Sequence, residues 1–270
     1  MRIAILGPRG TFSEEAALRF PEKELGLCSD IDDVFASVIH GDVDMGIVPV
    51  ENSLEGSVGM TLELLRRKDV KIAGEMVVDI RHILMAMPGT KLDEVKEVIS
   101  HPHALAQCKA YLKDLGVKSR NFASTAEAAK EISMKGLKGV AAIAPRISAE
   151  LYGLEILDAE IQDEEVNQTR FLMVANHDHK TTGHDKTSLI LELSEDRPGA
   201  LFEILKPFAE EKINLTKIES RPSRKALGDY IFYVDFEGHR EDPIIKKVLD
   251  GLEKNTASMK VLGSYPMESR

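Results

Sequence analysis

From residue 187 onward the chain carries two amphipathic stretches set among short apolar runs, a pattern that few folds accommodate. Leu189, Leu191 and Leu193 recur with a period of two, as in a strand with one buried face. Ile204 and Phe208 lie four positions apart, as on one face of a helix. The whole order is strand, helix, strand, strand, helix, strand. We predict an α+β ferredoxin-like (βαββαβ) domain over residues 187–265.

The part before it alternates apolar strands with amphipathic helices, which is typical of α/β domains with a largely parallel sheet. A polar, aperiodic stretch from Asn176 to Lys186 marks a linker. We predict a domain over 1–180 made of two lobes, with lobe 2 (about 78–157) inserted into lobe 1 (about 1–77 and 158–180). Two lobes joined by two crossings imply a cleft between them.

Composition excludes several classes of function. The net charge of −10 argues against nucleic acid and anionic membrane surfaces as partners, because both reward clustered Lys and Arg. The sequence shows no long apolar run and no secretory signal, so we expect a cytoplasmic protein. Cys28 and Cys108 are too few for a disulfide framework, and we expect both to be reduced and packed.

Glycine and small polar residues follow the first strand, Ile3–Leu6, in the loop Gly7–Ser13. We expect Ser13 to cap the next helix, where free N–H groups attract an anion, with Thr11 and Ser13 adding hydroxyl donors. Phe12 lies between them. A plain capped turn without a ligand is an equally good interpretation of this pattern.

A second such loop, Glu51–Gly56, follows the strand Met45–Val50, which we expect Pro49 to break. Asn52 and Ser53 are able to donate to a carboxylate, whereas Glu51 and Glu55 repel one unless they turn away. A routine helix cap is the alternative.

The stretch Asn167–Phe171 closes the α/β part and brings a hydroxyl, a guanidinium and an aromatic ring together. Arg170 is able to hold a carboxylate with two hydrogen bonds. Thr169 is a weak acid, so it serves as a proton donor only to a leaving group that is already primed to depart. A buried strand start with one surface arginine is the alternative.

The histidines suggest a metal, since His101 and His103, and likewise His177 and His179, are two positions apart. No thiolates join them and no His-Glu-x-x-His helix is present. We therefore favour capping or solvated roles and expect no metal site.

In the last domain, Gly199 opens a helix with Ala200 and Leu201, and Glu219, Ser220, Arg221 and Pro222 end a strand. Backbone N–H groups at the helix and the Glu219 carboxylate together suit a zwitterionic amino acid. A turn with an ordinary helix start fits equally well.

Taken together, these motifs resemble the prephenate dehydratase family over nearly the whole chain. The motifs are Gly7–Ser13, Pro49–Ser53 with Glu55 and Gly56, His101-Pro102 with Ala104–Cys108, and Asn167–Phe171. The C-terminal part resembles an ACT domain, the small-molecule regulatory module, through Gly199–Leu201 and Glu219–Pro222. His103 stands where the family pattern has Gln, and Phe202 follows Leu201 in place of a smaller aliphatic residue.

This resemblance implies a periplasmic-binding-protein-like type II fold for the catalytic part, with prephenate in the cleft. Loss of CO2 and water makes the ring aromatic, and this driving force requires no cofactor. Thr169 matches the essential threonine and assists the departing hydroxyl. The resemblance assigns substrate binding to Thr11, Phe12, Ser13, Asn52, Ser53, Gly56, Arg170 and Phe171, with Phe171 as a packing residue at the cleft wall.

The resemblance further implies the monofunctional form, without a chorismate mutase segment, acting as a homodimer or homotetramer whose ACT domains pair. L-phenylalanine is the expected feedback inhibitor, bound by Gly199, Ala200, Leu201, Glu219, Ser220, Arg221 and Pro222. Two alternatives remain open: arogenate dehydratase, which uses the amino analogue of prephenate, and a non-catalytic amino-acid-sensing protein that uses the same cleft.

Overall fold

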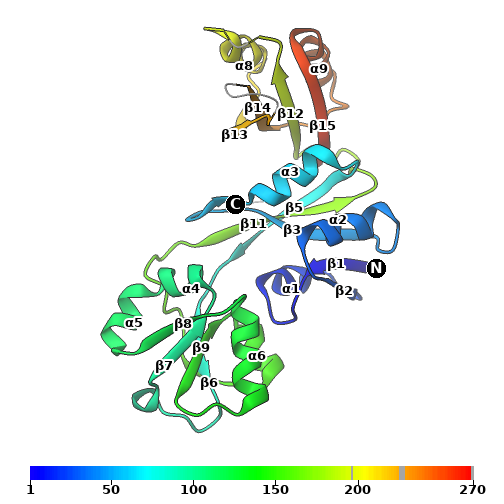
Figure 1. The fold of residues 1–270 in the computed structure, drawn as a ribbon. Helices are drawn as coiled ribbons and strands as arrows, with labels where there is room; N and C mark the ends of the chain where they lie inside the picture. Colours follow the sequence, from blue (N-terminus) through cyan, green and yellow to red (C-terminus); the bar gives the residue numbers. More distant parts are fainter. Residues whose placement is uncertain (196, 225–228, 269–270) are drawn as a thin grey trace.

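The computed structural model describes residues 1–195, 197–224 and 229–268 and contains three sheets, which form two lobes and a C-terminal domain (Figure 1). In lobe 1 the sheet order is β2-β1-β3-β11-β5, with β4 paired to β3. Its strands are β1 (Arg2–Leu6), β2 (Glu24–Cys28), β3 (Met45–Asn52), β4 (Gly56–Ser57), β5 (Lys71–Asp79) and β11 (Gln168–Ala175).

Helices cover both faces of the lobe 1 sheet, because its strands are apolar on both sides. Helix α1 (Phe12–Ala17) packs Ala16 and Ala17 on the face that also buries Phe171. Helices α2 (Ile31–Ile39) and α3 (Gly59–Arg67) cover the opposite face.

In lobe 2 the sheet order is β10-β6-β9-β7-β8. Its strands are β6 (Ile83–Ala86), β7 (Glu97–Ser100), β8 (Lys118–Asn121), β9 (Val140–Ala144) and β10 (Glu155–Asp158). Helices α4 (Pro102–Gln107) and α5 (Lys109–Leu115) cover one face, while α6 (Thr125–Lys135) and α7 (Arg146–Tyr152) cover the other. A short 3-10 turn, η1 (Leu92–Glu94), precedes β7.

The chain crosses between the lobes twice, after β5 and again between β10 and β11. On its return, β11 inserts antiparallel between β3 and β5. Both lobe sheets are therefore mixed, rather than largely parallel as predicted, because the strands that make the crossings run against their neighbours.

The C-terminal domain has the predicted βαββαβ order and a sheet arranged β13-β14-β12-β15. Its elements are β12 (Asp185–Leu193), α8 (Ala200–Glu210), β13 (Leu215–Pro222), β14 (Tyr230–Glu237), α9 (Pro243–Asn255) and β15 (Thr256–Pro266). Helices α8 and α9 cover one face of this sheet, and Phe208 packs against Phe236 with ring centroids 5.0 Å apart.

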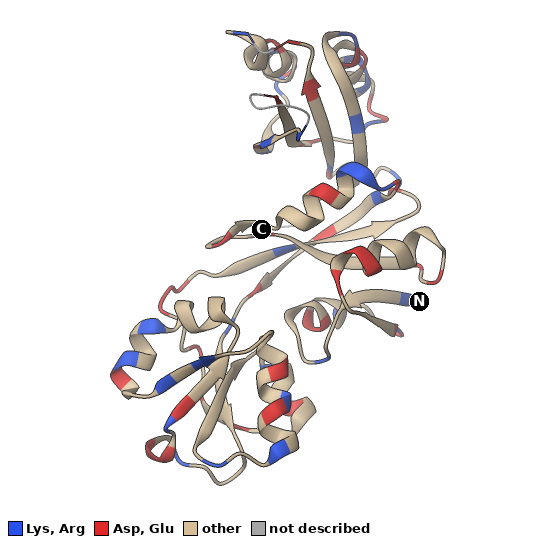
Figure 2. Cartoon of the chain, in the orientation of Figure 1, with Lys and Arg blue, Asp and Glu red and all other residues tan. Residues whose placement is uncertain are grey.

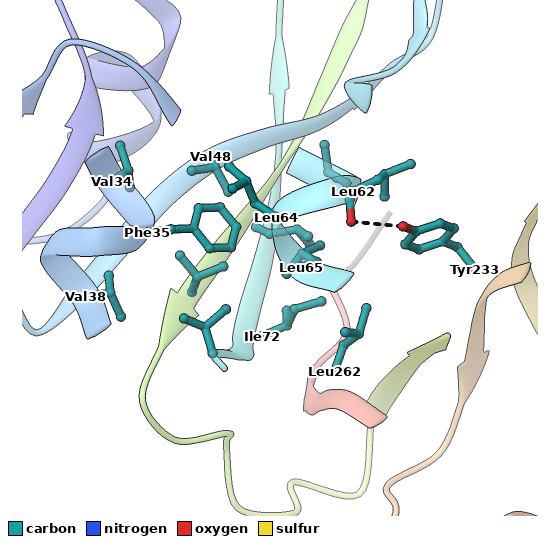
Figure 3. Packing of buried hydrophobic residues seen from close by; sticks show 14 of the residues in the cluster. Val34, Phe35, Val38, Val48, Leu62, Leu64, Leu65, Ile72, Tyr233 and Leu262 are labelled. Carbon is teal, nitrogen blue, oxygen red and sulfur yellow. Dashed lines mark hydrogen bonds between the residues drawn. The ribbon is translucent and has the colours of Figure 1, made fainter. Parts of the chain in front are cut away.

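The other face of the C-terminal sheet packs on lobe 1, so the two parts share one apolar core (Figure 3). Tyr233 contributes to this core and donates its hydroxyl to the Leu62 carbonyl at 3.0 Å. Lys260 donates to the carbonyls of Leu65 and Lys68 at the end of α3, at 2.8 and 2.7 Å. The C-terminal domain is therefore docked through apolar packing and a lysine cap on a helix end.

Several local expectations need correction. The cap of α1 is Thr11, whose Oγ1 accepts from Glu14 N–H at 3.3 Å, and Ser13 lies inside the helix. Strand β3 continues through Pro49. It accommodates this residue with a register shift against β11, in agreement with the missing N–H of proline. The apolar positions Leu105, Cys108, Leu112 and Leu115, spaced as on one helix face, fall instead in two helices, because the chain leaves helical geometry at Cys108.

Acidic and basic residues are interspersed over all three parts of the chain (Figure 2). No helix in the described ranges is long and apolar enough to cross a membrane. Cys28 and Cys108 are both free, and Cys108 is buried.

Candidate active site

A pocket of about 550 Å3 lies between the lobes and brings together most of the residues predicted for the cleft. The predicted residues that line it are Thr11, Phe12, Ser13, Asn52, Gly56, Thr169 and Phe171. They come from three places far apart in sequence: the start of α1, the turn from β3 to β4, and the start of β11. These segments meet because β1, β3 and β11 are neighbours in one sheet.

Thr169 is held by Asn52, its partner in the β3–β11 ladder. The Asn52 side-chain amide donates to Thr169 Oγ1 at 3.0 Å. The orientation of that amide is fixed because Asn52 Oδ1 accepts the backbone N–H groups of Leu54 and Glu55, at 2.9 and 3.0 Å. With its oxygen accepting from Asn52, the Thr169 hydroxyl keeps its own proton for another acceptor.

Ser53 has a structural role in this arrangement. Its backbone N–H donates to the Gln168 carbonyl at 2.9 Å, and its Oγ accepts the Gln168 N–H at 3.0 Å. Ser53 does not line the pocket that contains Thr169. Ser53 therefore holds the start of β11 through two hydrogen bonds and is not placed as the substrate donor that we predicted.

Arg170 is also placed elsewhere than predicted. Side chains alternate along a strand, so Thr169 and Phe171 face the pocket side while Arg170 points to the opposite face. Its guanidinium lies 2.6 Å from Glu75 and 2.7 Å from Asp235 of β14, and donates to Tyr265 at 2.9 Å. The prediction that Arg170 holds a substrate carboxylate therefore needs correction.

Neighbouring acidic groups keep the Arg170 guanidinium charged and paired. Burial lowers the pKa of Arg170, but the nearby Asp235, Tyr265 and Glu75 outweigh burial and hold that pKa well above its usual value. Burial raises the pKa of Asp235, but Arg170, Ser188 and Lys186 together outweigh burial and hold that pKa below its usual value. Lys186 completes the cluster at 2.6 Å from Glu75.

The Glu51 side chain points away from the pocket, so its charge does not face an anion bound there. Its carboxylate lies 2.9 Å from Lys217 of the C-terminal domain. Glu55 remains at the pocket wall, where Oε1 accepts from the Gln107 side chain at 3.3 Å.

Lobe 2 supplies pocket residues that the sequence analysis did not assign. Ser124 and Thr125, at the start of α6, line the pocket, and Ser124 Oγ accepts from Glu127 N–H at 3.0 Å. Ser124 and Glu127 have the spacing of a capping box, which predicts a helix start but does not show that the helix faces the cleft.

His101 and His103 also line the pocket. His101 Nδ1 accepts the His103 N–H at 3.3 Å, a capping contact at the start of α4. Burial, and then the neighbouring His103, lower the pKa of His101, while Glu55 opposes them. No group of three or more His, Cys, Asp or Glu within the described ranges has the arrangement of a metal site.

Gln107 and His82 complete the pocket wall. Gln107 Oε1 accepts from the Asn167 side-chain amide at 3.0 Å and lies 2.8 Å from His82 Nε2. Asn167 Oδ1 in turn accepts from the Asn52 amide at 2.8 Å. The only available signal for His82 was its place as a polar residue between two apolar extended segments.

The two motifs of the C-terminal domain lie at the same end of its sheet. Strands β12 and β13 both run antiparallel to β14, so Gly199, after β12, and Glu219, near the end of β13, lie at corresponding ends. Gly199 precedes α8 with a φ of +88°, which favours glycine, and Ala200 and Leu201 begin the helix.

Glu219 has partners on both sides of the domain junction. Its carboxylate accepts from Ser57 Oγ of β4 at 2.5 Å and from Arg221 at 2.8 Å, and lies 3.2 Å from Lys217. Burial raises the pKa of Glu219, but these donors outweigh burial and hold that pKa below its usual value. Ser57 also lines the pocket, so one hydroxyl joins the pocket wall to the C-terminal motif.

Comparison with known proteins shows which family the chain belongs to. The family described as Prephenate dehydratase matches residues 3–179, and the family described as ACT domain matches residues 187–254. The chain belongs to the prephenate dehydratase family. A curated prephenate dehydratase from Methanocaldococcus jannaschii is 44% identical over 96% of each chain.

Two further similarities within the prephenate dehydratase family bear on function. Arogenate dehydratase/prephenate dehydratase 2, chloroplastic, from Arabidopsis thaliana is 42% identical over all of this chain and 74% of its own length. A crystal structure of prephenate dehydratase in complex with L-Phe from Arthrobacter aurescens is 34% identical, covers 99% of this chain and 90% of that chain, and superposes with a TM-score of 0.91.

These findings confirm the predicted family, the predicted fold class and the predicted enzyme class, a prephenate dehydratase with a regulatory ACT domain.

Proposed function

We propose that prephenate binds in the pocket between the lobes and loses CO2 and water there, with Thr169 as the proton donor to the departing oxygen. The geometry of Thr169 supports this proposal most directly. The hydroxyl oxygen of Thr169 accepts from Asn52 at 3.0 Å, and Thr169 lines the pocket. The hydroxyl proton is therefore the part of Thr169 that is free to meet a substrate.

The chemistry balances with few protein groups. The bond from the ring to its carboxylate breaks, the electron pair moves through the ring, and the bond from C4 to the hydroxyl breaks. A proton from Thr169 completes the departing water, and Thr169 regains a proton from solvent when the product leaves. The overall reaction consumes one proton and transfers no electrons to another molecule, so the proposal includes no cofactor. Enclosure between the lobes strengthens each hydrogen bond.

The two carboxylates of prephenate need donors other than Arg170. The pocket lining in the described ranges includes neither Lys nor Arg. We assign them to hydroxyls and helix starts on both sides: Thr11 and Ser13 from lobe 1, and Ser124 and Thr125 from lobe 2. A substrate with two anionic ends would then bridge the lobes and favour closure.

We also propose that L-phenylalanine is the effector and binds at the end of the ACT sheet that carries Gly199 and Glu219. Backbone N–H groups at a helix start are able to donate to the carboxylate of an amino acid, and a side-chain carboxylate is able to accept from its ammonium group. Pairing of ACT domains in a cytoplasmic homodimer or homotetramer remains part of this proposal and is supported by the family resemblance.

Arogenate is the second candidate substrate, and Glu55 is the observation that favours it. This carboxylate lies at the pocket wall, where it is able to accept from an ammonium group that prephenate lacks. A comparison of kcat/KM on the two substrates decides between them. If Glu55→Gln lowers kcat/KM on arogenate alone, and arogenate is the better substrate of the wild type, the prephenate proposal is wrong.

The decisive experiment is an ultraviolet assay of phenylpyruvate formation from prephenate by the purified chain, with and without phenylalanine. Turnover that phenylalanine suppresses supports both proposals. Absence of turnover on both prephenate and arogenate would leave the amino-acid-sensing interpretation in place.

A further inference from the structure

His82 lies between β5 and β6, where the chain first crosses between the lobes. Its residue is only 2% exposed, its ring meets Phe12 edge to face with centroids 6.1 Å apart, and it lines the pocket. Its backbone N–H donates to the Gln162 side chain at 3.1 Å. The proposed elimination assigns no role to this buried imidazole.

The hydrogen bonds around His82 define its protonation. Gln107 donates its side-chain N–H to Glu55 at 3.3 Å, so its oxygen faces His82. An amide oxygen only accepts, and therefore His82 Nε2, 2.8 Å away, carries the proton. His82 Nδ1 is buried and has no hydrogen-bond partner within the described part of the chain.

A second proton on this ring would be costly. It would place a charge and an N–H group without a protein acceptor among the described residues at a buried position. Burial lowers the pKa of His82, and the hydrogen bond with Gln107 opposes this only in part. The ring is thus the neutral tautomer with its proton on Nε2.

This tautomer fits a chain of hydrogen bonds that ends at Thr169. Gln107 Oε1 accepts from His82 and from Asn167 Nδ2, at 2.8 and 3.0 Å. Asn167 is left with its oxygen toward Asn52, which donates to it at 2.8 Å and to Thr169 Oγ1 at 3.0 Å. In this arrangement the Asn52 amide group also lies 3.1 Å from the Gln168 carbonyl, and the Thr169 hydroxyl has no hydrogen-bond acceptor among the residues that the structure describes.

The same chain of contacts spans the cleft. Thr169 and Asn52 belong to lobe 1, Gln107 ends α4 of lobe 2, and His82 and Asn167 lie where the chain crosses between the lobes. The order of these donors and acceptors is therefore complete only when the lobes approach as they do here.

We propose that His82 is a positioning residue for the elimination: as a neutral imidazole it donates to Gln107 and, together with the backbone groups that hold Asn52, keeps Gln107, Asn167 and Asn52 where Asn52 donates to Thr169. This inference rests on the proposed role of Thr169 and adds the group that orients it. His82 itself transfers no proton.

The test compares His82→Leu with His82→Gln in the full chain. Leucine removes the donor, whereas glutamine places an N–H close to the position of Nε2. We expect His82→Leu to lower kcat about 10- to 100-fold with KM within about threefold, and His82→Gln to recover most of the loss. Equal losses in the two variants, or none, would show that His82 only fills space.

A double variant separates this inference from the role of Thr169. Because His82 acts through Thr169, adding His82→Leu to Thr169→Ala should lower kcat little further. If the decrease in kcat of the double variant equals the product of the two single decreases, the inference is overturned, even where Thr169 is confirmed as the donor. If the wild type turns over prephenate and Thr169→Ala matches it, the proposed role of Thr169 fails instead.

Nitrogen NMR of the wild-type chain labelled at histidine gives a readout that does not depend on a variant folding. We expect a hydrogen-bonded proton on His82 Nε2 and none on Nδ1 near neutral pH. The opposite tautomer, or a doubly protonated ring, would overturn the inference.

Discussion

Arg170 of β11 and Asp235 of β14 form a 2.7 Å ion pair across the junction between lobe 1 and the ACT domain. The next residue toward the start of β11 is Thr169, which faces the pocket. One short strand thus carries the proposed proton donor on one face and a buried link to the regulatory domain on the other. We infer that a shift of the ACT sheet acts on β11 directly.

Substitution of Thr169 tests the proton donor. Thr169→Ala should lower kcat by orders of magnitude with a modest change in KM, because the hydroxyl acts on the departing oxygen rather than on ground-state binding. Thr169→Ser keeps the hydroxyl and is expected to retain much more activity. Steady-state kinetics on prephenate measures both variants, and a kcat near wild type for Thr169→Ala would exclude the assignment.

Removal of the Arg170 guanidinium tests the domain junction. Arg170→Met removes the cation paired with Asp235 and leaves Glu75 with Lys186 alone, and we expect a loss of about 3 to 5 kcal/mol in the free energy of unfolding. Urea denaturation measures this loss. Arg197→Ala is the matched control, because its ion pair with Glu203 is exposed, and its urea midpoint should stay at the wild-type value.

Substitution of Gly199 tests the effector site. Gly199 has a φ of +88°, which a β-branched residue does not adopt without strain. Gly199→Val should therefore disturb the start of α8 and weaken inhibition by phenylalanine at least tenfold, an order-of-magnitude expectation, while activity without phenylalanine stays within about twofold.

Gly251→Ala provides the comparison for this experiment. Gly251 lies in α9 with open space around it and an ordinary helical φ, so inhibition of this variant should match the wild type. A loss of activity in Gly199→Val equal to its loss of inhibition would argue against a separate regulatory site. Ser220→Ala, in the other motif, should give the same separation of activity from inhibition.

Lowering the pH should decrease the free energy of unfolding through the buried His82. Its pKa is lowered from 6.5, so above about pH 6.5 the folded and unfolded chains both hold it neutral. As the pH falls below that value the unfolded chain binds the proton first. The free energy of unfolding therefore decreases until the pH passes the folded pKa.

The His82→Gln variant isolates this contribution from those of the carboxylates. Urea midpoints measured from about pH 7.5 to pH 5 should decrease more for the wild type than for the variant. Parallel decreases in the two proteins would mean that His82 is as easily protonated in the folded chain as in the unfolded one.

Sequence patterns predicted elements best where the local signal was strong. Leu189 and Leu191, predicted on one face of a strand, are both buried in β12, and Ile204 and Phe208, predicted on one face of a helix, are both buried on α8. Strand β2 and helix α2 were not predicted, although Asp30 caps α2 and its apolar residues are buried. The cap of α1 was misplaced by two residues, because Thr11 and Ser13 are equally good caps and only backbone geometry decides between them.

By itself the sequence determined the βαββαβ domain, the two-lobed α/β part, the family and the loops that form the pocket, since each depends on local periodicity or on a motif. Only the tertiary structure decided which way side chains point. Thr169 and Arg170 are adjacent in sequence, yet strand alternation and the docked ACT sheet send one to the cleft and the other to Asp235. His82, Ser124 and Thr125 reach the pocket because the lobes fold toward each other, a relationship that no short stretch of sequence contains.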